Sequence, residues 1–412
     1  MSKKIEELGN QYNNYIYPKP CEDINTEWIL KNKFLQGDPN YHWHKLWPER
    51  PYSREKMNIL VAGCGANQAA ILAKCNPVHN FIGIDISLAS INHHKKLKKN
   101  FDIDNLELIC DDFRNQTFRF NFDYIISTGV IHHLEDPNSA LSFFNNLLKD
   151  QGVLYLMVYG NQESSSIQSL KEIFKKFELS QNKESINNIR NLINKLDKNH
   201  PSKIFINQFA DFNYDSGVVD LFLNVQEKFY SLKELTNDLK DNNFVIKNFM
   251  DGKVAAVSKY FINNTDLHKK FKKLAIEEQL NIAQILNWKD RKIEVICTKT
   301  HNKKYSRYYS NIDFEKIYVY QFESIDYIFL KDSIEIKNTK DGSIFKLNFD
   351  NKKLDWKKIL SGKYELKNLM HELSKIEKEN FLKLIEFFIE NYLLDYSFHR
   401  IEDCKKFYNS AK

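Results

Sequence analysis

The apolar positions between residues 57 and 160 fall into short runs, and amphipathic stretches separate these runs. Short apolar runs bounded by turn residues are typical of strands buried on both faces, whereas apolar positions three and four apart are typical of helices. The pattern predicts strands at residues 58–62, 80–85, 106–110, 122–127 and 153–159. Because strands that alternate with helices form parallel sheets, we expect an α/β fold that binds ligands at the carboxyl ends of its strands.

Side chains that can cap helices mark where several of the intervening helices begin. Ser87 can cap a helix whose inward side includes Leu88, and Asp136 stands before a proline at a first helical position. Ser231 and Glu234 have the spacing of a capping box ahead of a later helix. We therefore expect helices directly after residues 87, 136 and 231.

Two insertions and a reversed last strand are predicted beyond residue 160. Residues 161–228 are polar with helical stretches, and an insertion directly after the fifth strand overhangs the ligand cleft. It is a candidate lid that selects the substrate, although Asp211, Tyr214 and Asp220 within it read as surface loop residues. A strand at 244–249, a second insertion at 252–290 and a last strand at 291–299 would complete this domain, which spans residues 57–299.

Residues 300–412 differ in composition and predict a small α+β domain for contacts or regulation. An aromatic, strand-like stretch is followed by alternation around Asp341-Gly342, a signal for a type I′ hairpin, and then by a largely helical stretch. Because the predicted sheet is complete by Lys299, we expect a fragment ending there to fold by itself.

The first 56 residues are aromatic and contain Tyr12, Tyr15 and Tyr17. Prolines at positions 18, 20, 39, 48 and 51 argue against a long helix, so we expect an irregular arm with one helix near residues 25–34. Such an arm must cover another surface to bury its rings. It is either a packed extension or a segment whose tyrosines form a wall of the active site.

Composition narrows the class of protein. A length of 412 residues leaves room for two or three domains, and a hydrophobic fraction of 42% is enough to build their cores. No apolar run is long enough for a membrane span or a signal peptide. We therefore expect a cytoplasmic protein. The net charge of +6 comes from lysines spread along the chain, which does not indicate a nucleic-acid surface. Six scattered cysteines and the isolated pair His42 and His44 predict neither disulfides nor a metal site.

The stretch from Met57 to Asp85 carries the clearest chemical signal. Gly63 and Gly65 allow the backbone to approach a ligand closely, and the N–H groups of the following helix face that ligand. Asp85 is suitably placed to accept hydrogen bonds from both hydroxyls of a ribose. Gln68 occupies the third glycine position of a dinucleotide fingerprint, which counts against a nicotinamide-dependent oxidoreductase.

Five ordered motifs over about one hundred residues resemble the class I S-adenosylmethionine-dependent methyltransferases: VAGCGAN, GIDIS, CDDF, FDYIISTGVIHHLEDP and LLKDQGVLYLMVYG. The segments ILVAGCG, YIYPKP and GVIHHLEDP look most like a bacterial subgroup that is often fused to tetratricopeptide repeats. No repeat of about 34 residues is visible here. The resemblance implies a Rossmann-like methyltransferase sheet with helical insertions.

The resemblance also implies which residues bind S-adenosyl-L-methionine. The glycines and the end of the fourth strand would face its methionine part, Asp85 its ribose and Asp111 its adenine amino group. The implied set is Gly63, Gly65, Asp85, Ile86, Asp111, Asp112, Phe113, Thr128 and Gly129. Two positions depart from the family pattern: Val61 replaces an acidic residue, and Asn67 replaces a third glycine. Because asparagine tolerates left-handed backbone geometry, we expect the turn to survive.

We accordingly expect a methyltransferase that moves a methyl group by in-line SN2 displacement to oxygen or nitrogen of a small molecule or peptide. His133 is the candidate general base and His132 the second, although one imidazole packing under the cofactor and the other capping a turn is an equally good interpretation. The expected acceptor-binding residues are Tyr12, Tyr15, Tyr17 and Tyr159.

Two alternatives stay open. An inactive cofactor-binding scaffold is motivated by Val61 and Asn67. A nucleic-acid methyltransferase is the other, but the fourth strand ends in Ser-Thr-Gly-Val and lacks the Pro-Pro-aromatic type of loop that grips a flipped base.

Overall fold

The structure is a computed structural model, and it describes residues 3–24, 37–208, 210–261, 265–288, 291–309, 311–321, 325–330, 332–338, 344–348 and 353–401. The helix expected at residues 25–34 and the turn expected around Asp341-Gly342 lie outside the described residues.

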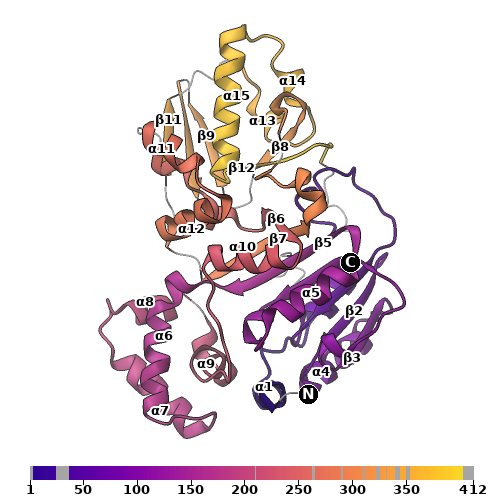
Figure 1. Ribbon diagram of the computed structural model, residues 1–412, viewed down its shortest axis with the longest axis vertical. Helices are drawn as coiled ribbons and strands as arrows, with labels where there is room; N and C mark the ends of the chain where they lie inside the picture. Colours follow the sequence, from indigo (N-terminus) through magenta and orange to yellow (C-terminus); the bar gives the residue numbers. More distant parts are fainter. Residues whose placement is uncertain are drawn as a thin grey trace.

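A seven-stranded sheet organises the larger part of the molecule (Figure 1). Its strands are β1 (Asn58–Ala62), β2 (Asn80–Asp85), β3 (Leu106–Cys110), β4 (Phe122–Thr128), β5 (Leu148–Tyr159), β6 (Phe244–Phe249) and β7 (Lys292–Lys299). Their order is β3-β2-β1-β4-β5-β7-β6, and β7 alone is antiparallel to its neighbours β5 and β6. The carboxyl ends of β1 to β5 therefore meet at one edge, as the sequence predicts.

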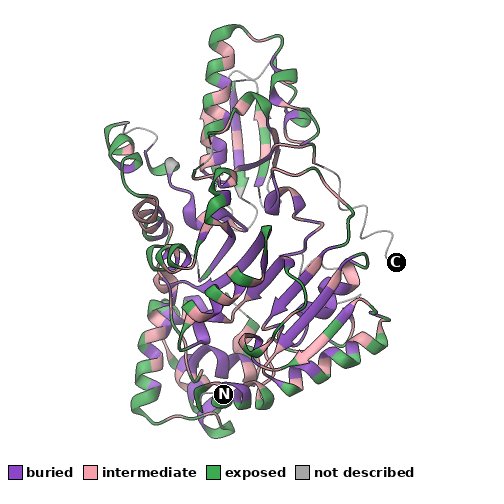
Figure 2. Ribbon diagram, turned by 45° about the vertical axis from the view of Figure 1, so that its right-hand side comes forward, coloured by how far each residue is buried: buried purple, intermediate pink, exposed green. Residues whose placement is uncertain are grey.

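Helices cover both faces of this sheet, so its strands are buried almost throughout (Figure 2). Alternate side chains of β1 enter different cores: Leu60 and Ala62 join α5 (Pro137–Leu147) and α10 (Leu232–Asp241), whereas Ile59 and Val61 join α3 (Gln68–Cys75) and α4 (Leu88–Asn100). This two-sided burial explains why the strands are continuous apolar runs in the sequence.

The predicted helix caps are present. Ser87 and Asp136 each accept a hydrogen bond from a backbone N–H of their helix, and Ser231 forms a full capping box with Glu234. The expectation that Leu88 points inward is wrong, because its side chain is 52% exposed. Leu88 is the first residue of α4, where side chains tilt toward the start of the helix.

The N-terminal arm packs on the sheet through its aromatic side chains. The expectation of an irregular start is wrong: α1 (Lys3–Asn14) is a helix, because the first helix-breaking proline comes only at position 18. A short helix α2 (Trp43–Leu46) follows, and Trp47 is fully buried with its indole N–H donating to the carbonyl oxygen of Gln151 at 3.3 Å.

The first insertion forms a helical subdomain beside the sheet edge (Figure 1). Its helices are α6 (Asn161–Lys176), α7 (Lys183–Lys195), α8 (Pro201–Ile206) and α9 (Asp215–Phe222), and they enclose an apolar core of their own. The second insertion contains α11 (Thr265–Lys272) and α12 (Ile276–Asn287), of which α12 packs on α10.

The C-terminal module is small and mixed, as expected from its sequence. Its elements are β8 (Tyr318–Gln321), β9 (Ile325–Leu330), β10 (Ser333–Asn338), β11 (Ile344–Asn348), α13 (Trp356–Ile359), α14 (Leu366–Leu369), α15 (Lys375–Glu390) and β12 (Leu394–Ser397). They form a three-stranded sheet β11-β10-β9 and a two-stranded sheet β12-β8 around a separate apolar core. None of the helices described has both the length and the hydropathy that crossing a membrane requires.

Candidate cofactor and acceptor site

The turn after β1 brings the backbone close to the carboxyl edge of the sheet. Gly63 and Gly65 have φ values of +71° and +54°, which side-chain-bearing residues rarely adopt. A Cβ on Gly63 would lie 2.2 Å from a methyl carbon of Val130, and one on Gly65 would lie 3.0 Å from Cδ of Pro18. Both positions therefore need glycine on grounds of conformation and of space.

Asp85 at the end of β2 holds this turn in place. Its Oδ2 accepts a hydrogen bond of 2.8 Å from the N–H of Gly65, and its Oδ1 accepts one of 2.9 Å from the N–H of Ser87. Burial raises the pKa of Asp85 above its ordinary 3.8, while these two bonds favour the ionised form. A carboxylate offers about four acceptor positions, so both oxygens can still accept from ribose hydroxyls.

The residues after β3 are held by local contacts. Asp111 accepts from the N–H of Asp112 at 2.7 Å and from the Gln116 amide at 2.7 Å. Asp112 forms an ion pair of 2.7 Å with Arg114 and caps the short helix η2 (Phe113–Asn115). The Phe113 ring stacks on Phe144 with centroids 5.1 Å apart. Since Arg114 occupies the carboxylate of Asp112, Asp111 is the better placed of the two for an adenine contact.

One cavity of about 210 Å³ lies against the glycine turn and the residues that follow β2 and β3. Every one of the nine residues expected to bind the cofactor lines it: Gly63, Gly65, Asp85, Ile86, Asp111, Asp112, Phe113, Thr128 and Gly129. His133, Tyr12, Tyr17 and Tyr159 line it as well. Lining residues that sequence reasoning missed include Pro18, Gln68, Met157, Asp220 and Lys292. Gln68, which takes the place of a glycine in the dinucleotide pattern, accepts a hydrogen bond of 3.0 Å from Thr128.

Two predicted site residues do not reach this cavity. Tyr15 donates from its hydroxyl to the carbonyl oxygen of Gln181 at 3.0 Å and packs against the core of the first insertion. His132 is fully buried next to Tyr159, with ring centroids 4.5 Å apart. Sequence spacing alone does not distinguish these two from their neighbours, because alternate residues of an irregular segment or short helix face different surroundings.

Asn67 fastens the arm over the glycine turn. Its Oδ1 accepts from the N–H of Cys21 at 3.0 Å, and its Nδ2 donates to the carbonyl oxygen of Lys19 at 2.9 Å. The expectation that Asn67 relies on left-handed backbone geometry is wrong, because its φ is −132°. Asn67 instead acts through its side chain, which holds residues 19–21 against the turn.

The far end of the cavity is closed by the arm, β5 and the first insertion together. The Tyr12 hydroxyl donates to Oδ1 of Asp220 at 3.2 Å, and the Tyr17 hydroxyl donates to Asp211 at 3.3 Å. Arg291 lies 3.6 Å from Asp211, and its guanidinium sits 4.5 Å from the centre of the Tyr159 ring. Burial raises the pKa values of Tyr12 and Tyr17, so both hydroxyls stay protonated.

Asp220 is the main functional candidate that sequence reasoning placed wrongly. It was expected at the surface, but it is 2% exposed and lines the cavity. Its Oδ2 is buried and has no hydrogen-bond partner among the described residues, and burial raises the pKa of the carboxyl. The signal in the sequence is that apolar residues of α9 flank Asp220 on both sides, because burying an unpaired carboxylate among apolar residues is costly.

The two histidines have different surroundings. His133 lies 2.8 Å through Nδ1 from the carbonyl oxygen of Gln226, so Nδ1 is the donor in this hydrogen bond. Both ring nitrogens of His132 are buried without a partner among the described residues, and burial lowers the pKa of this imidazole well below 6.5. His133 is therefore the only one of the pair that faces the cavity.

Residues 53–210 match a family model described as a methyltransferase domain. An uncharacterized protein of Synechococcus sp. is 28% identical over 146 residues, which cover 32% of this chain and 34% of that protein. The match thus spans about a third of the relative's length. The bacterial subgroup with tetratricopeptide repeats stays a prediction.

The fold resembles that of PKMT2 from Rickettsia typhi. The two structures superpose with a TM-score of 0.61 at 16% sequence identity, and the match covers 87% of this chain and 75% of the PKMT2 chain. A complex of the same protein with AdoHcy gives a TM-score of 0.59 at 18% identity, with 88% and 75% covered. The expected Rossmann-like methyltransferase fold is confirmed, and residues 53–210 carry the match to a methyltransferase domain.

Proposed function

We propose that the whole chain transfers a methyl group from S-adenosyl-L-methionine to oxygen or nitrogen of a small molecule or a peptide side chain. One observation carries this proposal: the same cavity of about 210 Å³ is lined by the glycine turn and Asp85 and also by Tyr12, Tyr17, Tyr159 and Asp220. An enclosed cleft of this kind suits a single small group better than a nucleic-acid duplex.

The residues present fit the cofactor. Gly63 and Gly65 line the cavity beside Thr128 and Gly129, and without side chains at these two positions the backbone could lie against the methionine part of the cofactor. Asp85 would hold the ribose hydroxyls, and Asp111 would accept from the adenine amino group. When bound, the cofactor supplies an electrophilic methyl group on a sulfonium.

The chain's own contribution to the reaction is alignment and exclusion of water. Met157, Tyr12 and Tyr17 line the cavity and contribute apolar surface to its wall. Positive charge on sulfur disappears as the methyl group moves, so a low-polarity wall favours the transition state over the bound reactants. Holding the acceptor in line with the methyl group supplies most of the remaining acceleration.

Asp220 is our first candidate for the group that anchors the acceptor and receives its proton. Its free Oδ2 can accept from an O–H or N–H of the acceptor, and its raised pKa brings it closer to the range of a general base. His133 is the second candidate, since the residue lines the cavity and its Nδ1 is held by the carbonyl oxygen of Gln226.

Methyl transfer from labelled S-adenosylmethionine by the full chain tests the proposal. The protein is incubated with a metabolite extract, a peptide digest and nucleic acid, and each fraction is counted. We expect label in the metabolite or peptide fraction, and a loss of about 10²-fold or more in Asp220→Asn. Asp215→Asn is the matched control, because Asp215 lies on the same helix but pairs outward with Lys183 and Arg190. Label in nucleic acid alone would support the runner-up, and no transfer to any fraction would support a scaffold.

A further inference from the structure

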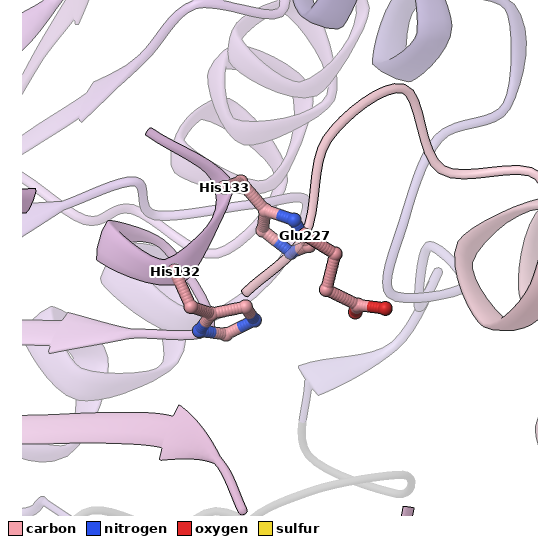
Figure 3. A group of neighbouring side chains, drawn as sticks. All are labelled: His132, His133 and Glu227. Atoms are coloured by element: carbon pink, nitrogen blue, oxygen red, sulfur yellow. The ribbon is translucent and has the colours of Figure 1, made fainter. Parts of the chain in front are cut away.

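Three side chains with metal-binding atoms converge at the side of the cavity that His133 lines (Figure 3). His132 and His133 come from the short helix η3 (Ile131–His133) after β4, and Glu227 comes from the segment that leads out of the first insertion. One ligand atom from each lies within 4.8 Å of the others. The N–H of Lys228 donates to the carbonyl oxygen of His132 at 2.8 Å and keeps the two segments side by side.

His132 is the observation that calls for a ligand. It is fully buried, and neither ring nitrogen has a hydrogen-bond partner among the described residues. Leaving such a group unpaired in a protein interior is costly. An imidazole nitrogen is a common ligand of transition-metal ions, so a cation held between these side chains would satisfy the buried ring.

The other two side chains are held as metal ligands usually are. His133 donates its Nδ1 proton to the carbonyl oxygen of Gln226 at 2.8 Å, which fixes the tautomer and leaves Nε2 free. Glu227 has a side chain only 3% exposed, and its Oε2 lies 2.5 Å from Nζ of Lys171. That contact orients the carboxylate and leaves Oε1 available for coordination.

We propose that His132, His133 and Glu227 bind one divalent transition-metal ion, with Zn²⁺ as the best match. Two imidazoles and one carboxylate form a ligand set that suits zinc and its neighbours, whereas Mg²⁺ and Ca²⁺ prefer oxygen ligands alone. The ion would join η3 to the end of the first insertion and so fix one wall of the acceptor end. Sequence reasoning missed this site because Glu227 is far from the histidines along the chain.

Metal uptake by the full-length protein tests this proposal without any activity assay. Protein stripped with a chelator and dialysed is titrated with Zn²⁺ by calorimetry and with Co²⁺ by visible absorption. We expect one ion per chain and cobalt d–d bands of a low-symmetry site. Glu227→Gln and His132→Asn should each weaken Zn²⁺ binding by at least about 10²-fold, because each removes a direct ligand.

Controls separate loss of a ligand from loss of structure. Lys171→Gln removes the ion pair to Glu227 but no ligand, so it should still bind one Zn²⁺ per chain. His371→Ala removes an exposed histidine beside Glu372 and should change nothing. If His132→Asn fails to fold, Glu227→Gln decides the matter. No uptake of Zn²⁺ at one equivalent, or equal uptake by the native protein and Glu227→Gln, would overturn the site whether or not methyl transfer is found.

Discussion

At the scale of single residues, Asp85 affects both the stability of the fold and the binding of the cofactor, and these two properties depend on pH in opposite directions. Burial raises its pKa in the folded protein above 3.8, so the folded state holds this proton more tightly than the unfolded chain. Its contribution to stability is therefore complete below the unfolded pKa and is lost as pH rises through the folded pKa. Ribose hydroxyls, in contrast, donate to the ionised form, so cofactor affinity should increase with pH across the same window.

Replacing Asp85 with asparagine tests both roles. We expect Asp85→Asn to weaken S-adenosylmethionine binding by about 1–3 kcal/mol, because charge-assisted hydrogen bonds are lost. The increase of affinity with pH above 3.8 should disappear in this variant. Calorimetry at several pH values measures both effects, and Asp104→Asn at an exposed position serves as control. Native affinity in a folded Asp85→Asn protein would contradict the role of this residue.

Some residues of the candidate site can be predicted from the sequence, and others cannot. The positions that line the cavity at strand ends follow from motif order, because the carboxyl ends of parallel strands meet at one edge. The role of Asp220 does not follow, since a side chain in an insertion is placed by tertiary packing and not by local pattern. The His132, His133 and Glu227 cluster was missed for the same reason.

At the scale of elements, the arm and the first insertion are fastened to each other and to the sheet. Oε1 of Gln11 accepts from the N–H of Val225 at 3.0 Å and from the Gln181 amide at 2.8 Å, which adds to the contacts made by Tyr12 and Tyr17. Periodicity predicted the strands and most helices of the sheet region well. The arm was predicted poorly because its prolines hid the helical segment that precedes them.

Asn67 provides the test at this scale. Asn67→Ala removes the bonds to Cys21 and Lys19, and we expect a decrease of about 1–3 kcal/mol in the free energy of unfolding, measured with urea. Asn67→Gly restores the residue usual in the resembling family and should not recover stability, because the side chain and not φ is what matters here. Native stability of the glycine variant would show that the two bonds contribute little.

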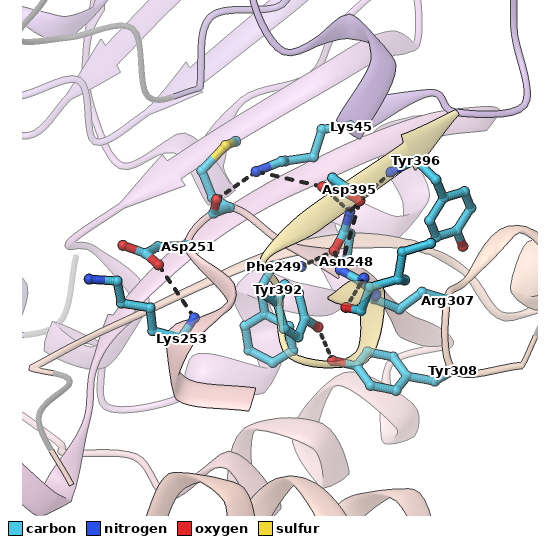
Figure 4. A network of polar contacts seen from close by, with 12 residues as sticks. Lys45, Asn248, Phe249, Asp251, Lys253, Arg307, Tyr308, Tyr392, Asp395 and Tyr396 are labelled. Carbon is cyan, nitrogen blue, oxygen red and sulfur yellow. Dashed lines mark hydrogen bonds and ion pairs between the residues drawn. The ribbon is translucent and has the colours of Figure 1, made fainter. Parts of the chain in front are cut away.

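At the scale of the whole molecule, a buried charged cluster connects the C-terminal module to the rest (Figure 4). Asp395 of β12 is fully buried, and its carboxylate lies 3.8 Å from Lys45 of the arm and 3.8 Å from Arg307. The Asn248 amide of β6 donates to the same carboxylate at 3.2 Å. Independent folding of a fragment ending near Lys299 stays a prediction, but this cluster argues against it, because Lys45 would lose its counter-charge.

Asp395→Ala measures the strength of this connection. We expect the free energy of unfolding to fall by about 3–5 kcal/mol, because removing one partner leaves buried cations without a counter-charge. Asp326→Ala, at an exposed position of β9, should stay within about 0.5 kcal/mol of the native value. A small effect of Asp395→Ala would instead favour a module that is only loosely attached and would restore the expectation of an independent fragment.

The central claim is that one cavity holds the cofactor under the arm and the first insertion, and hydrogen exchange with and without S-adenosylhomocysteine tests it most directly. The claim predicts slower exchange in residues 8–20 of the arm and in residues 215–227 of the insertion, together with the glycine turn at residues 63–68. Protection of the turn while the arm and the insertion exchange as fast as before would contradict the enclosed acceptor site and leave an open cleft in its place.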